Sequence, residues 1–162
     1  MKSLANKLEV LKEFFDWNGS LDVPEISVEK DGVAISNPFV DSTGRELTAE
    51  QAIKQYGEST VQDLVEEVIR YKIDSIAQTI AAMYHDLGGN KVIKPENGNR
   101  PEWAGLVDAM CRAYDELCTY WTVATALELM RACNRLRGHE DDVIYWLDLN
   151  QDVLDLMEVL DD

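Results

Sequence analysis

Residues 60–87 decide the fold of this chain, with the sequence TVQDLVEEVIRYKIDSIAQTIAAMYHDL. Apolar residues recur in it at intervals of three and four, the spacing that returns side chains to one face of a helix. The members of this row are Val61, Leu64, Val65, Val68, Ile69, Ile73, Ile76, Ile80, Met83 and Leu87. Ser59 or Thr60 can cap the helix, and Gly88-Gly89 can end it. The pattern predicts a helix over 60–87 whose apolar face packs in a bundle.

The C-terminal segment, residues 139–162, combines a high density of acids with a second apolar row. It carries nine carboxylates and no Lys or Arg. Its large apolar residues are Val143, Ile144, Trp146, Leu147, Leu149, Val153, Leu154, Leu156, Met157, Val159 and Leu160. A disordered acidic tail would lack such anchors, because a chain needs apolar area to offset its ordering entropy. We therefore expect a helix over 140–160 that packs by one face and holds its acids out to solvent.

Residues 101–137 continue the helical spacing between these two segments. Pro101 suits a first helical position, and the row stops at Gly138. The pattern predicts one long helix, or two helices with a bend near 119–123, where β-branched residues weaken helix propensity. The polar residues 90–100 are expected to form a loop inside the domain.

The N-terminal half adds short elements to this helical framework. The apolar spacing predicts a helix over 4–17, and the Asp31-Gly32 pair between alternating residues predicts a β-hairpin over 26–36. Thr48 and Gln51 match a capping box that opens a helix over 48–56. The expected fold is mainly α, a helical bundle with a small N-terminal β-hairpin, in a single domain over 1–162.

The charge balance limits the partners of the chain. It has 162 residues, enough for one domain with a sizeable core, and a formal net charge of −16. Such a charge repels nucleic acid and anionic membranes by long-range Coulomb forces, and it favours a basic partner. The alternative explanation is that the acidity serves only solubility.

Cysteine usage and hydropathy indicate a cytoplasmic protein. No apolar run approaches the roughly 18 residues that span a bilayer, and the first residues lack the apolar core of a signal peptide. The odd number of cysteines, Cys111, Cys118 and Cys133, argues against a disulfide scaffold. We expect their thiols to be reduced and buried as small hydrophobic groups.

Catalytic and metal-binding patterns are weak, so we expect no enzyme, no metal and no cofactor. His85-Asp86 has the order of a phosphohydrolase metal pair, but the only other histidine, His139, lies at an expected turn. Glu13 and Asp16 have the spacing of magnesium ligands one helical turn apart, without a matching pair on a second helix. Acids three residues apart are common by chance in so acidic a chain.

The acids of the C-terminal helix form the candidate site. Asp141, Asp148, Asp155 and Asp162 recur every seven residues, and Asp152 falls between two of them. On a helix this gives axial steps of about 4.5, 6 and 10 Å, comparable with the closely spaced phosphates of DNA. The residues predicted to bind the partner are Asp141, Asp142, Asp148, Asp152, Asp155, Glu158 and Asp162. The alternative is the solvated face of an amphipathic helix.

In charge, size and helicity the chain is similar to DNA-mimic antirestriction and anti-CRISPR proteins of phages and mobile elements. The resemblance implies a non-enzymatic inhibitor that occupies the basic surface of a host nucleic-acid-binding enzyme or complex, without binding nucleic acid or membrane itself. The alternative function is a helical adaptor or assembly chaperone that binds a protein through apolar faces. A homodimer is left open.

Overall fold

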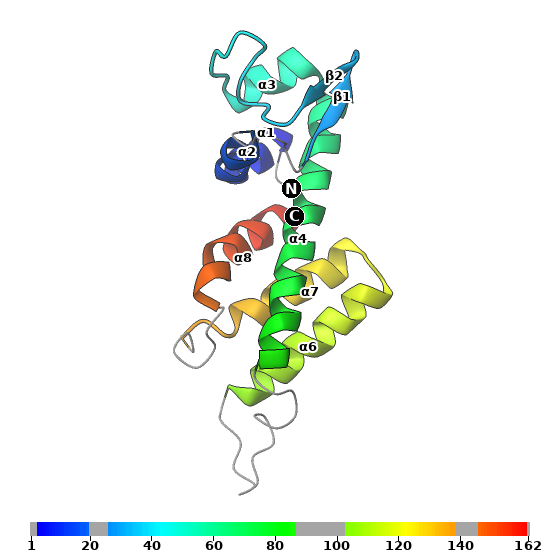
Figure 1. Ribbon diagram of the computed structural model, residues 1–162, viewed down its shortest axis with the longest axis vertical. Coiled ribbons are helices and arrows are strands. Elements are labelled where there is room, and N and C mark those ends of the chain that lie inside the picture. Colours follow the sequence, from blue (N-terminus) through cyan, green and yellow to red (C-terminus); the bar gives the residue numbers. More distant parts are fainter. Residues whose placement is uncertain (1–2, 20–25, 87–102, 139–145, 162) are drawn as a thin grey trace, which may run out of the picture. The chain divides into compact units, whose positions relative to one another are not determined.

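The computed structural model describes residues 3–19, 26–86, 103–138 and 146–161. Within these residues the chain forms helices and one antiparallel pair of strands, which confirms a mainly α fold with a small N-terminal hairpin (Figure 1). The chain divides into two compact units, residues 1–71 and 72–161, and the division falls within the long helix α4, Glu58–Asp86. The single domain expected over 1–162 stays a prediction.

The first unit begins with two short helices in place of the one helix expected over 4–17. Helix α1, Leu4–Val10, ends at Leu11, whose amide donates to the carbonyls of Lys7 and Glu9, and α2 follows as Lys12–Gly19. Leu11 is buried at the break, as are Leu8 before it and Phe14 and Phe15 after it. Because the apolar spacing continues across the break, periodicity alone does not reveal it.

The hairpin consists of β1, Val28–Lys30, and β2, Val33–Ile35, with Glu29 opposite Ala34. Asp31 and Gly32 both have positive φ, 53° and 82°, as a two-residue type I′ turn requires. The sequence prediction of an Asp-Gly hairpin is confirmed.

Asn18 fastens the end of α2 to both flanks of the hairpin. Its side chain is fully buried, and its amide donates to the carbonyls of Ile26 at 2.8 Å and Ser36 at 3.1 Å. Its oxygen accepts from the amide of Ile26 at 3.1 Å. A buried amide that is satisfied in this way fixes the position of the hairpin, which would be marginal in isolation.

Helix α3, Ala49–Tyr56, starts at the predicted capping box. The amide of Gln51 donates to Thr48 Oγ1 at 3.2 Å, and the amide of Thr48 donates to Gln51 Oε1 at 2.9 Å. Gly57, with φ of 92°, ends the helix, and α4 begins at the next residue. Every described member of the predicted α4 row is buried, and the side chains of Met83 and Leu87 lie outside the described residues.

The second unit is built from the C-terminal half of α4 and three further helices. Residues 101–137 contain two helices, α6, Ala104–Thr119, and α7, Val123–Asn134, with the bend where β-branched residues cluster. Helix α8, Trp146–Leu160, covers the described part of the helix expected over 140–160. Helix α7 packs against both α6 and α8. The core includes Val107, Met110, Leu129, Met130, Leu136, Val153 and Leu156.

Candidate acidic binding site

The predicted site residues divide into those the structure places and those it does not. Asp141, Asp142 and Asp162 lie outside the described residues. Asp148 lies on α8, but its side chain is not described. Asp152, Asp155 and Glu158 are described on the last three turns of the same helix, at spacings that bring them near one another.

The anchoring of α8 is as expected from its apolar row. Val153, Leu156, Val159 and Leu160 are at most 8% exposed, so one face of the helix is packed. Burial of a Val or Leu side chain contributes about 1.5–3 kcal/mol relative to its exposure, so all four residues favour the packed position of the helix. The acids of α8 therefore sit on a packed helix rather than on a free tail.

Asp152 faces the protein itself. Its Oδ2 lies 2.9 Å from Nζ of Lys72 on α4, with the side chain of Asp152 39% exposed and that of Lys72 19% exposed. The predicted role for Asp152 was an outward carboxylate. The ion pair instead directs this carboxylate toward Lys72 and links α8 to α4.

Asp152 and Asp155 lie at the edge of the packed face of α8. Val159 follows Asp155 by four residues on the same strip of the helix and is 2% exposed. A strip that contains a buried valine cannot be the middle of the solvent face. Asp155 is partly buried and accepts from Nε2 of Gln151 at 2.9 Å.

Among the acids of α8 and its end whose side chains are described, Glu158 and Asp161 are the most exposed. Both are exposed, and Asp161 Oδ1 is 3.9 Å from a guanidinium nitrogen of Arg131 on α7. Arg131 also lies 3.2 Å from Glu128, one turn earlier on α7. Arg131 therefore links α7 to the end of the acidic helix, at a long distance. Asp161 was not among the predicted site residues, although its outward position follows from the same helical spacing.

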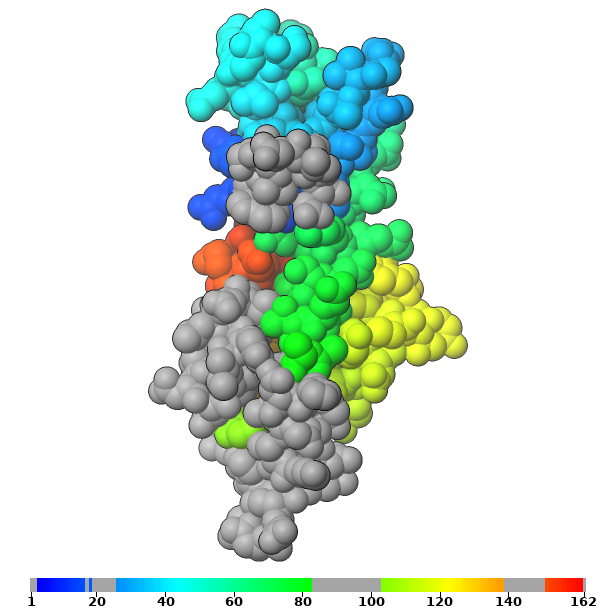
Figure 2. All heavy atoms as spheres, viewed as in Figure 1, coloured from blue at the N-terminus to red at the C-terminus, as the bar shows by residue number. Residues whose placement is uncertain are grey.

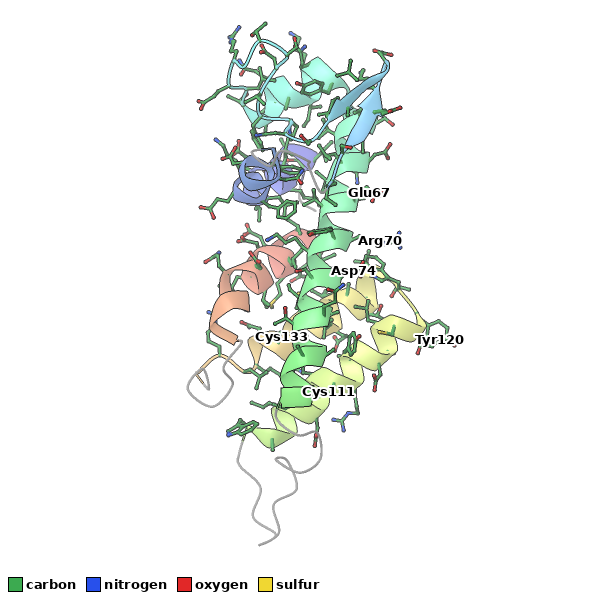
Figure 3. The ribbon with its side chains drawn as sticks, viewed as in Figure 1. Glu67, Arg70, Asp74, Cys111, Tyr120 and Cys133 are labelled. Atoms are coloured by element: carbon green, nitrogen blue, oxygen red, sulfur yellow. The ribbon has the colours of Figure 1, made fainter. Side chains whose placement is uncertain are left out.

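Sequence reasoning missed the exposed apolar residues. Among the described residues three large apolar side chains are more than half exposed: Val33 at 63%, Tyr120 at 67% and Val123 at 56%. Tyr120 and Val123 lie at the connection between α6 and α7, and Figure 3 shows Tyr120 pointing away from the helices. The apolar spacing through 101–137 gives no sign of this exposure, because the exposure depends on how the chain turns between α6 and α7.

The cysteines differ in their surroundings. Cys133 is buried and Cys111 is half-buried, whereas Cys118 is exposed, so the expectation of three buried thiols is wrong for Cys118. Burial raises the pKa of the Cys133 thiol to about 12, and burial together with the charges of Asp108 and Asp115 raises the pKa of Cys111 to about 11. Neither group is a thiolate at neutral pH.

The described residues contain no group of three or more His, Cys, Asp or Glu placed to hold a metal ion. The side chains of His85 and His139 lie outside them. In the same part of the chain no helix combines the length and the hydropathy that crossing a bilayer requires. No family model, curated protein or solved structure matches the chain.

Proposed function

We propose that the protein is a non-enzymatic binding protein whose acidic C-terminal helix occupies a basic surface of a partner protein. The observation that carries the proposal is the packing of α8 by Val153, Leu156 and Val159, together with a segment, 139–162, that has nine acids and no Lys or Arg. Carboxylates on a packed helix lose little conformational freedom on binding, which favours affinity.

The partner that such a surface fits is a protein that normally binds phosphate groups. A nucleic-acid-binding enzyme or complex presents a basic groove, and a row of carboxylates supplies charges of the same sign as the DNA backbone. In this proposal Asp155 and Glu158 take the place of phosphates, with Asp148 on the same helix. Asp152 contributes less, because it is paired with Lys72.

The proposal is tested by neutralising Asp155 and Glu158 together, as Asp155→Asn with Glu158→Gln. The matched control is Glu66→Gln with Glu67→Gln on α4, two exposed acids removed by equally conservative changes. The two variants also lose the same kind of hydrogen bond. Gln62, one turn before Glu66, donates to it at 3.0 Å, and Gln151, one turn before Asp155, donates to that carboxylate in the same way.

The partner is first captured from a bacterial lysate at low salt, eluted by raising the salt, and purified. Its affinity for the parent and both variants is then measured by calorimetry at several salt concentrations. We expect the α8 variant to bind at least about tenfold more weakly with a reduced salt slope, and the α4 control to bind as the parent does. Competition by double-stranded DNA for the same partner is expected if the acids stand in for phosphates. Equal affinities of the two variants would contradict the proposal.

An adaptor that binds through apolar residues is the second candidate. The exposure of Tyr120 and Val123 favours it. Its complex would keep its affinity as salt is raised, because an apolar interface is not screened.

A further inference from the structure

The connection between α6 and α7 presents apolar side chains from a backbone that is held on both sides. The amide of Tyr120 donates to the carbonyl of Glu116 at 2.8 Å, and its carbonyl accepts from Oγ1 of Thr125 at 2.7 Å. Thr122 and Thr125 bond reciprocally as a capping box at the start of α7. Since both backbone groups of Tyr120 are bonded, its ring is displayed from a fixed position.

The two exposed apolar residues lie three positions apart in the sequence, at the connection between α6 and α7. Tyr120 is the C-cap residue of α6, two positions before the N-cap Thr122 of α7, and Val123 is the first residue of α7. Cys118 beside them is also exposed. Figure 2 shows this connection, in yellow, projecting from the helices to which it belongs. Exposed aromatic residues on a rigid support are typical of the anchors that carry most of the energy at protein interfaces.

The charges beside Tyr120 are negative. Asp115 and Glu116 are exposed at the C-terminal end of α6, and the last turn of that helix has no basic residue. Acids at this end add to the negative pole of the helix dipole instead of compensating it, so they cost stability. The nearest base on α6 is Arg112, one turn further back. A cation would be stabilised here by the acids and by the face of the Tyr120 ring.

We propose that residues 115–124 form a docking surface for a basic segment of a partner protein, one that inserts an apolar side chain flanked by Lys or Arg. A second copy of this chain fits less well, because it would bring the same acids together in a molecule of net charge −16. The surface differs from the acidic site on α8. Figure 1 places α8 and the α6–α7 connection on opposite sides of the unit formed by residues 72–161.

The test uses two synthetic peptides, an amidated helix of Leu and Lys and its equivalent with every Leu replaced by Ser. Both have the same charge, so a comparison separates apolar docking from charge attraction. Amide shifts are recorded in ¹⁵N spectra of the full chain, and affinities are measured by calorimetry at 0.15 M salt, about physiological ionic strength. We expect the Leu peptide to shift amides at 115–124 and to bind at least about tenfold more tightly than the Ser peptide.

Variants of the chain decide whether Tyr120 is the anchor. Tyr120→Ser with Val123→Ser should weaken the Leu peptide about tenfold, whereas Tyr120→Phe should retain binding because it keeps the ring. The matched control is Val33→Ser, which removes an apolar side chain of similar exposure from the hairpin and should change nothing. Circular dichroism checks that each variant keeps its helicity.

Three outcomes would overturn the proposal. The first is a set of shifts centred on residues 151–161, which would assign the peptide to the acids of α8. The second is equal affinity for the Leu and Ser peptides. The third is a dimer of the parent chain in sedimentation experiments, together with a monomer for Tyr120→Ser. That result would make the surface an interface between copies of this chain.

Discussion

Lys72 Nζ lies 2.9 Å from Asp152 Oδ2 and joins α4 to α8 across 80 positions of the sequence. The pair lies within the unit formed by residues 72–161. Asp152 thus helps to attach the helix, whereas Glu158, further along the same helix, is exposed to solvent. A binding site on this helix would therefore offer a partner fewer acids than the spacing of acids in the sequence suggests.

We predict that removing the Lys72–Asp152 pair has a small effect on stability. Because Asp152 is more than a third exposed, water screens the attraction, and pairs of this kind contribute about 0–1 kcal/mol. Asp152→Asn should lower the free energy of unfolding by no more than about 1 kcal/mol, and a double-mutant cycle with Lys72→Met should give a coupling that shrinks in 1 M salt. Urea unfolding measures both quantities. A coupling above about 3 kcal/mol would mean that the pair is sealed from water.

The elements of the fold could be predicted from sequence because their signals are local. The α4 row, the capping box at Thr48 and the Asp31-Gly32 turn each rest on residues a few positions apart, and the structure has all three. The break at Leu11 could not be predicted, since apolar spacing is the same on both sides. The capping box of α7 was missed because Thr125 occupies the position where Glu or Gln is the usual signal.

The candidate site was predicted less completely than the fold. Helical spacing placed Asp152 on a strip with Asp148 and Asp155, but it could not show that Lys72, far away in sequence, lies opposite. The exposure of Tyr120 depends on how α6 and α7 meet, which no pattern of neighbouring residues specifies. Asn18 likewise lies just after the helix expected over 4–17, and helical spacing does not show its three hydrogen bonds, which involve residues up to 18 positions away.

We predict that Asn18→Ala destabilises the unit formed by residues 1–71. The change leaves an amide and two carbonyls near Ile26 and Ser36 without their partner, and each buried unsatisfied group costs about 1–3 kcal/mol. We expect a loss of at least about 2 kcal/mol in urea unfolding. Asn6→Ala, at an exposed position of α1, is the control and should cost less than about 0.5 kcal/mol. A variant as stable as the parent would mean that water replaces the amide.

We predict that the carboxyl of Asp41 titrates below its usual range. The hydroxyl of Thr43 donates to Asp41 Oδ1 at 2.6 Å, and the amides of Thr43 and Arg45 donate at 2.9 and 3.0 Å. The hydroxyl bond is the main cause that lowers the pKa of Asp41 below 3.8. Because the folded form has the lower pKa, this contribution to loop stability is complete above pH 3.8 and is lost as the pH falls through the folded value.

The Asp41 titration is measured by the chemical shift of its carboxyl carbon. Thr43→Val removes the hydroxyl but keeps the amide donor, so the midpoint should move up toward 3.8. A midpoint of Asp41 that is unchanged by Thr43→Val would show that the hydroxyl bond is absent in solution.

We predict that one of the three thiols reacts rapidly with a disulfide reagent in the folded protein. Cys118 is exposed, whereas burial raises the pKa of Cys133 to about 12 and, with two nearby acids, that of Cys111 to about 11. At pH 8 only about 10⁻³ of Cys111 and about 10⁻⁴ of Cys133 would be thiolate, the reactive form. We expect one fast equivalent per chain in the native state, three in guanidinium, and none that is fast in native Cys118→Ser. Raising the pH from 8 to 9 should speed the slow reaction of Cys111 about tenfold, because its thiolate fraction rises with pH below the pKa. Rapid native labelling of Cys133 would mean that α6 and α7 separate easily.

With Cys118 two residues from Tyr120, a bulky adduct on this thiol should also block the Leu peptide, while the same reagent should leave peptide binding to Cys118→Ser intact.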